Sequence, residues 1–179
     1  IPWWTTDIGG FFGANINDPE FHELLVRWFE YGCFCPVMRL HGYRWPLQPQ
    51  YGTTGGATCV SGAPNEVWSY TDQVCEILSD YLRLRERMLP YITELMEEAH
   101  EKGTPVMRPL FYDFPEDKES WNVETEYMFG PKVLVKPITD ADARETDVYL
   151  PGGASWTNAW TGETFEGGQK VHVAAPIEQ

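Results

Sequence analysis

The feature that most constrains the fold is an apolar run that opens the chain and stops at an acid and a glycine pair. It reads Ile1-Pro2-Trp3-Trp4-Thr5-Thr6-Asp7-Ile8-Gly9-Gly10-Phe11. Aromatic and β-branched residues favour a buried strand, and the two glycines allow the backbone to turn sharply. A carboxylate is costly to bury without a partner. We therefore expect Asp7 to face a polar cleft or a fixed donor, with Phe11 at the cleft wall.

A helix and a second apolar strand follow this run. Asp18 is suited to an N-cap and Pro19 to the first helical position, and Gly32 ends the element. One face of this helix is predicted to be apolar: Phe21, Leu24, Leu25, Trp28 and Phe29. Residues 35–40 then form a short apolar segment that ends at His41-Gly42. Strand, helix and strand in this order indicate a βαβ unit with parallel strands.

Polar side chains come directly after both predicted strands. Asp7 ends the first strand and His41 follows the second. In a β/α barrel the functional side chains project from the carboxyl ends of the strands. Asp7 and His41 are therefore expected on one wall of a site.

The rest of the chain divides into a loop, a long helix and a series of short strands. Tyr43, Arg44 and Trp45 open an irregular stretch to residue 70, and they either line the outer part of a cleft or pack against the barrel rim. A helical stripe over residues 72–102 predicts one helix, with a kink or break before Pro90 and a buried partner for Arg85.

After Gly103 the apolar period changes from helical to alternating. The strand candidates are residues 104–112, 127–129, 132–138, 146–150, 155–160 and 169–175. Short strands separated by turn signals predict an antiparallel β-sandwich.

Charge and cysteine content exclude several classes of function. The net charge of −14 argues against nucleic-acid partners and anionic membrane surfaces, and no apolar run is long enough to cross a bilayer. Four cysteines (Cys33, Cys35, Cys59 and Cys75) fit neither a disulfide framework nor a zinc site. A bridge from Cys59 to Cys33 or Cys35 is an alternative, but we expect free buried thiols and no cofactor.

Five motifs in order resemble glycoside hydrolase family 31, which holds α-glucosidases and α-xylosidases. They are residues 4–11 (WTTDIGGF), 38–42 (MRLHG), 82–91 (LRLRERMLPY), 103–111 (GTPVMRPLF) and 149–153 (YLPGG). The resemblance implies an α/β region followed by an all-β region. Residues 1–103 would be the last β/α units of a TIM (β/α)8 barrel, and residues 104–179 an incomplete, proximal C-terminal β-sandwich. Lys136 departs from the family, where a small residue is usual.

The resemblance also implies roles for particular residues. Phe11 would pack against the sugar in the −1 pocket, His41 would donate a hydrogen bond to a sugar hydroxyl, and Asp7 would support the pocket. Arg39 would form a structural ion pair nearby. Neither motif that carries the family's two catalytic aspartates occurs here, so no residue of this chain is expected to be catalytic.

We therefore expect a fragment of a retaining, exo-acting α-glycosidase that releases terminal α-linked glucose or xylose. The fragment alone would be inactive, with a glycoside or oligosaccharide as the parent's substrate, and its uncovered apolar faces predict self-association. The alternative is a non-catalytic carbohydrate-binding or structural β-sandwich module. Glucose and xylose are not distinguished by these residues.

Overall fold

The structure is a computed structural model that describes residues 3–179, so Ile1 and Pro2 of the opening run lie outside the described residues. The chain divides into two compact units. One consists of residues 5–33 and 37–88, and the other of residues 1–4, 34–36 and 89–179. The long helix α2 (Asp72–Lys102) belongs in part to each of them.

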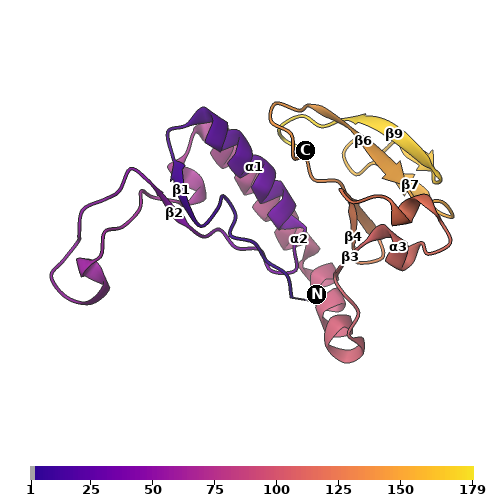
Figure 1. Cartoon of the computed structure of the whole chain (residues 1–179), viewed down its shortest axis with the longest axis horizontal. Coiled ribbons are helices and arrows are strands. Elements are labelled where there is room, and N and C mark those ends of the chain that lie inside the picture. The colour runs from indigo at the N-terminus through magenta and orange to yellow at the C-terminus, as the bar shows by residue number, and fades with distance from the viewer. Residues whose placement is uncertain (1–2) are drawn as a thin grey trace. The chain divides into compact units, whose positions relative to one another are not determined.

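The first unit is a small βαβ arrangement. Strand β1 (Phe12–Asn15) leads into helix α1 (Pro19–Cys33) and then to strand β2 (Tyr43–Trp45). The two strands pair in parallel, and an isolated parallel bridge joins Ile8 to Leu40 ahead of them. Figure 1 shows α1 running alongside the first part of α2. The predicted parallel pairing is confirmed.

Both strands begin later than predicted, because a turn interrupts the ladder. The described residues before Ile8 form no strand, and residues 35–39 form none either. At the turn, the Gly10 N–H donates to the Asp7 carbonyl at 2.8 Å, and Gly9 has φ of +82°. A type II turn requires a positive φ at this third position, which glycine adopts without steric cost. The ladder therefore reduces to one bridge before the turn and a short strand pair after it.

Helix α1 begins as its sequence predicts. The Asp18 side chain accepts a hydrogen bond from the Glu20 N–H at 3.0 Å, as expected of an N-cap. The side chains buried along α1 include Phe21, Leu25, Val26, Phe29 and Cys33. Leu24 was wrongly placed on the apolar face, since 52% of it is exposed. Because α1 packs mainly through one stripe, a residue at its margin faces solvent.

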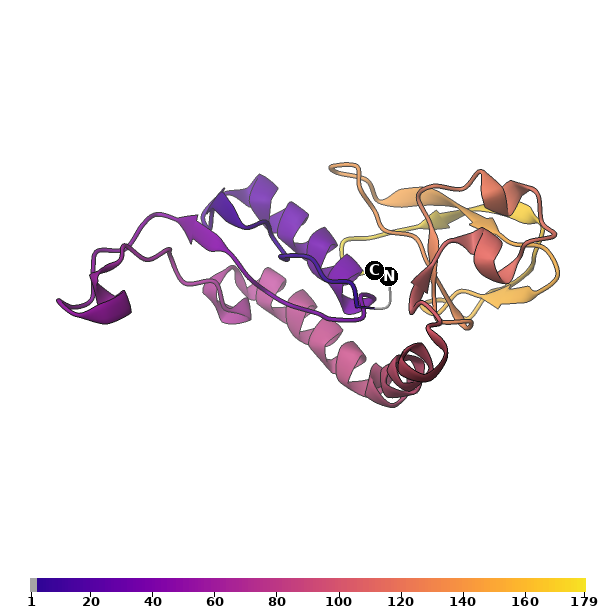
Figure 2. The ribbon, with the colours of Figure 1, turned by 60° about the horizontal axis from the view of Figure 1, so that its bottom comes forward.

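Helix α2 has the predicted bounds and is unbroken at Pro90. Of the predicted kink or break, the break does not occur, and the division between the two compact units falls at Met88/Leu89, one residue before the proline. Arg85 has its predicted partner, since its Nη1 donates to the Cys33 carbonyl at 2.6 Å. Between β2 and α2 the chain forms an arm, with the short 3-10 helix η1 (Gly55–Thr58) at its far end and η2 (Val67–Ser69) near α2 (Figure 2).

Residues after Gly103 form antiparallel sheets with two short helices. The sheets are β3 (Met107–Arg108), β4 (Tyr127–Phe129) and β5 (Val133–Val135); β6 (Glu145–Leu150) with β9 (Gln169–Ala174); and β7 (Ser155–Thr157) with β8 (Thr164–Glu166). The short helices are α3 (Leu110–Asp113) and η3 (Glu119–Trp121). Of the strand predicted over 104–112, only Met107–Arg108 form one, and the chain then turns into α3; β8 was not predicted.

Leu110, Met128 and Tyr149 form a buried cluster in this part of the chain. Lys136 is accommodated at the sheet surface, where its Nζ donates to the Thr125 hydroxyl at 2.5 Å and lies 3.8 Å from the Glu126 carboxylate. Lys136 stands where a small residue is usual in the family, and its ammonium group is satisfied by these local polar partners.

All four cysteines are free, but only Cys33 and Cys35 are buried, and Cys59 is exposed on the arm. No helix within residues 3–179 is long and apolar enough to cross a membrane. The same residues hold no group of three or more His, Cys, Asp or Glu side chains placed to bind a metal ion.

Candidate functional site

The three predicted site residues flank the Ile8–Leu40 bridge: Asp7 directly precedes it, and Phe11 and His41 follow it. Ile8 is fully buried, and its N–H donates to the Arg39 carbonyl at 3.2 Å. Because side chains alternate along a strand, the neighbours of the buried Ile8 face the other way. Asp7 is half-buried, and Phe11 and His41 are exposed.

Asp7 and Arg39 form an ion pair across this bridge, between Asp7 Oδ1 and Arg39 Nη2. The ion pair predicted for Arg39 is therefore present. Within residues 3–179 no hydrogen bond to Asp7 Oδ2 is found. The carboxylate is oriented through one oxygen, and the other can accept a further hydrogen bond.

Phe11 and His41 lie against each other, with ring centroids 5.6 Å apart and an interplanar angle of 41°. Phe11 is 62% exposed, so it is not a core residue. The structure thus brings an aromatic face and an imidazole together, and pairs a carboxylate with a guanidinium on the residues that flank the same bridge. Such a combination can bind a neutral polar ligand through one apolar face and several hydrogen bonds.

Arg44 does not line a cleft, contrary to one of the two interpretations of the loop that follows His41. It is fully buried, and its guanidinium donates to the carbonyls of Gly10 at 2.8 Å and Ile8 at 3.1 Å. Weaker contacts reach the carbonyls of Tyr43 at 3.4 Å and His41 at 3.5 Å. Carbonyls at a strand end lack ladder partners, and the planar fork of arginine can satisfy several at once.

The Arg44 side chain also lies over the ring of Phe21 on α1, with Cζ 5.2 Å from the ring centroid. It therefore links the helix to the turns that carry Phe11 and His41. Sequence reasoning missed this role, because nothing next to Arg44 in the sequence indicates burial.

A second support holds the backbone after His41. The Asn65 side-chain Nδ2 donates to the Gly42 carbonyl at 3.4 Å, and the Tyr70 hydroxyl donates to Asn65 Oδ1 at 2.6 Å. Burial raises the pKa of the Tyr70 hydroxyl, while Arg44 acts in the opposite direction. Tyr70 therefore remains a neutral donor at physiological pH and fixes the loop from the η2 side.

The backbone leaves no room for a side chain at position 42. The φ of Gly42 is +131°, and a Cβ at this position would collide with the Gly10 carbonyl oxygen. The close approach of two backbone segments keeps His41 next to Phe11.

Comparisons with known proteins show the family of the chain. Residues 1–95 match the family description "Glycosyl hydrolases family 31 TIM-barrel domain", and residues 103–179 match "Glycosyl hydrolase family 31 C-terminal domain". Among curated relatives, an α-xylosidase of Saccharolobus solfataricus is 36% identical over 99% of this chain and 22% of its own length. An α-glucosidase 2 of Bacillus thermoamyloliquefaciens is also 36% identical, over 96% of this chain and 19% of its own.

A solved structure gives a close match in three dimensions. It is a family 31 α-xylosidase from a soil metagenome in complex with xylose, with a TM-score of 0.94 and 50% identity over 99% of this chain. The match covers 27% of that protein, so the chain spans about a quarter of the length of such relatives. The fold is therefore the end of a TIM barrel followed by the C-terminal β domain, and the chain belongs to glycosyl hydrolase family 31.

Proposed function

We propose that this chain is the C-terminal part of a retaining, exo-acting α-glycosidase that releases terminal α-linked xylose or glucose. The observation that carries the proposal is the pairing of Asp7 with Arg39 and of Phe11 with His41 at one end of a parallel bridge. These groups would form one wall of the pocket for the terminal sugar.

Each side chain has a distinct part in this proposal. Phe11 presents an exposed ring to the apolar face of the sugar. His41 and the free oxygen of Asp7 exchange hydrogen bonds with its hydroxyls, and Arg39 holds the Asp7 carboxylate in a fixed direction.

Cleavage of the glycosidic bond needs two further carboxyl groups about 5 Å apart, one as nucleophile and one as acid and base. We propose that both come from barrel strands that are absent from this chain. The 179-residue chain alone should then release no nitrophenol from p-nitrophenyl α-xyloside, whereas the longer protein that contains it should. Activity of the isolated chain would refute this division of labour.

Xylosides are the substrates that we favour within this class. The relative of solved structure that is 50% identical in sequence and the curated relative that is 36% identical are both named α-xylosidases. The measurement is the ratio of kcat/KM for p-nitrophenyl α-xyloside and α-glucoside in the longer protein. A ratio below one would move the proposal to glucosides without affecting the pocket residues.

Substitutions in the longer protein test the pocket itself. His41→Ala and Phe11→Ala should each lower kcat/KM by about 10- to 100-fold, the equivalent of about 1–3 kcal/mol of lost binding in the transition state. His100→Ala and Trp160→Ala are matched controls, because both residues are exposed and lie outside the cluster. Equal effects of the cluster and control variants would contradict the assignment.

We also propose that the isolated chain self-associates. Phe11 precedes β1, Phe12 is its first residue and Trp45 is the last residue of β2, and they are 62%, 72% and 45% exposed. Contiguous exposed apolar residues on a small protein favour association. Light scattering across a range of concentrations should show a mass that rises above that of the monomer, and a constant monomeric mass would count against the proposal.

A further inference from the structure

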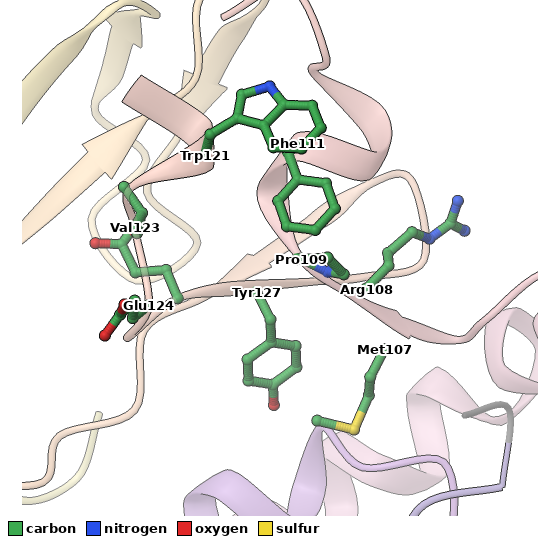
Figure 3. Close-up of a pocket in the computed structure, with 9 residues that line it drawn as sticks. Met107, Arg108, Pro109, Phe111, Trp121, Val123, Glu124 and Tyr127 are labelled. Atoms are coloured by element: carbon green, nitrogen blue, oxygen red, sulfur yellow. The ribbon is translucent and has the colours of Figure 1, made fainter. Parts of the chain in front are cut away.

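A pocket of about 550 Å³ lies on the C-terminal β domain and shares no residue with the cluster around Asp7. Its lining includes Arg108, Phe111, Trp121, Glu124 and Tyr127. The volume is within the range of small-molecule sites. Figure 3 shows Phe111 and Trp121 together on one side of the pocket, Glu124 on another, and Tyr127 opposite the two stacked rings.

Trp121 provides a flat apolar surface that is already fixed in place. Its ring stacks on Phe111, with centroids 4.5 Å apart and an interplanar angle of 11°. Its Nε1 donates to the Pro115 carbonyl at 3.0 Å, yet 58% of the residue is exposed. Because the ring is held by a stack and by a hydrogen bond, a ligand that packs on it loses little affinity to side-chain ordering.

The polar groups of the pocket favour a neutral ligand with hydroxyl groups. Glu124 is exposed and makes no hydrogen bond or ion pair with the described residues, so its carboxylate can accept from hydroxyls. The Arg108 guanidinium is paired with Asp113 at 3.1 Å. Glu126 is buried, and both of its oxygens accept from the Tyr149 N–H at 3.0 and 3.2 Å.

The charges of the pocket exclude anionic ligands. The positive charge of Arg108 is neutralised by Asp113, and two other lining residues, Glu124 and Glu126, carry carboxylates. The whole chain has a net charge of −14. A phosphate or a nucleic acid would be repelled. A sugar ring has one apolar face of C–H groups and a rim of hydroxyls, which matches an exposed indole beside a free carboxylate.

We propose that this pocket is a second carbohydrate site, which binds a neutral sugar unit of an oligosaccharide with Trp121 as the stacking platform and Glu124 as an acceptor. It would hold a longer substrate without taking part in bond cleavage. The site needs no catalytic activity in the chain, so it stands or falls separately from the proposed glycosidase function.

The test is titration of the 179-residue chain with isomaltotriose, followed through the indole N–H signals in NMR spectra. The signal of Trp121, assigned by its absence in Trp121→Phe, should shift with a saturable dependence on sugar. Trp121→Ala should weaken binding at least about tenfold, Glu124→Gln about threefold, and Trp121→Phe less than Trp121→Ala because it keeps a flat ring. Trp160→Ala is the matched control, since Trp160 is 50% exposed and does not line the pocket.

Several outcomes would overturn the proposal. They are an unmoved Trp121 signal at saturating sugar, equal affinities of the Trp121→Ala and wild-type chains, or a signal that moves with protein concentration instead of sugar, which would make the pocket a contact between copies. Circular dichroism verifies that each variant is folded, and Trp121→Phe provides the comparison if the alanine variant unfolds. Phe11→Ala should leave this binding unchanged, which separates it from binding at the proposed catalytic pocket.

Discussion

Replacement of Arg44 by methionine should strongly destabilise the unit that carries the candidate site. The variant keeps a long apolar side chain but removes all donors to the carbonyls of Gly10 and Ile8, which accept at 2.8 and 3.1 Å. A buried acceptor that loses its donor costs about 1–3 kcal/mol, so two of them cost about 2–6 kcal/mol.

Removal of a buried charge offsets part of this cost, because the desolvation penalty of the guanidinium disappears with it. We therefore expect a net loss of about 2–4 kcal/mol in the free energy of unfolding. Arg44→Lys should fall between the wild type and Arg44→Met, since an ammonium group cannot reach both carbonyls in the planar geometry of the fork.

Urea denaturation followed by circular dichroism measures the free energy of unfolding, and amide hydrogen exchange locates the effect. The Tyr43 N–H, which donates to the Phe11 carbonyl at 2.9 Å, should lose protection in Arg44→Met. Arg83→Met is the matched control, because Arg83 and Asp80 form an exposed ion pair that contributes less than about 1 kcal/mol. A loss below about 1 kcal/mol in Arg44→Met, equal to that of the control, would refute the bracing role.

Three further perturbations follow from the contacts described. Gly42→Ala should lower the midpoint of urea denaturation, since its methyl group would meet a backbone carbonyl at a φ of +131°; an unchanged midpoint would contradict the close approach. Burial of Asp117 acts to raise its pKa, but hydrogen bonds such as that from the Tyr149 hydroxyl outweigh burial and hold the pKa below its usual range. Stability from Asp117 should thus be present above about pH 4 and be lost as pH falls through this lowered pKa, and Asp117→Asn should flatten that acid limb in thermal melts. Hydrogen bonds to acidic side chains, chiefly Asp147, raise the pKa of His172, so Asp147→Asn should lower the His172 pKa in an NMR titration, and an equal pKa in both chains would be inconsistent with the cross-strand pair.

Local sequence signals predicted the helices well. Helix α2 has the bounds 72–102 that its apolar stripe indicated, and Arg85 on that stripe has a carbonyl partner in Cys33. The bounds of α2 depend on interactions within the helix, and the partner of Arg85 depends on the apolar face on which Arg85 lies. Strand bounds depend on partners elsewhere in the chain, and this is why β1 and β2 start at Phe12 and Tyr43 instead of at the apolar runs before them.

The candidate site was predictable in its exposed parts only. Asp7 and His41 were predicted as site residues because each comes at the end of an apolar segment, and Phe11 because it follows the turn after Asp7; their role in binding stays a prediction. The ion pair of Asp7 with Arg39 is present as expected. Arg44 was assigned to a cleft wall or a rim, because an arginine in a loop beside two aromatic residues carries no local sign that its side chain turns inward.

The burial of Arg44 has a physical cause in the backbone around the candidate site. The carbonyls of Ile8 and Gly10 lie at the sharp turn of Gly9–Gly10, between the Ile8–Leu40 bridge and the paired strands β1 and β2. The buried Arg44 guanidinium donates to both carbonyls from the interior of the unit. Phe11 and His41 can therefore stay exposed and Asp7 half-buried. A site of this kind therefore requires side chains that face solvent and a buried side chain that binds the backbone. Only the side chains that face solvent can be recognised from the local sequence.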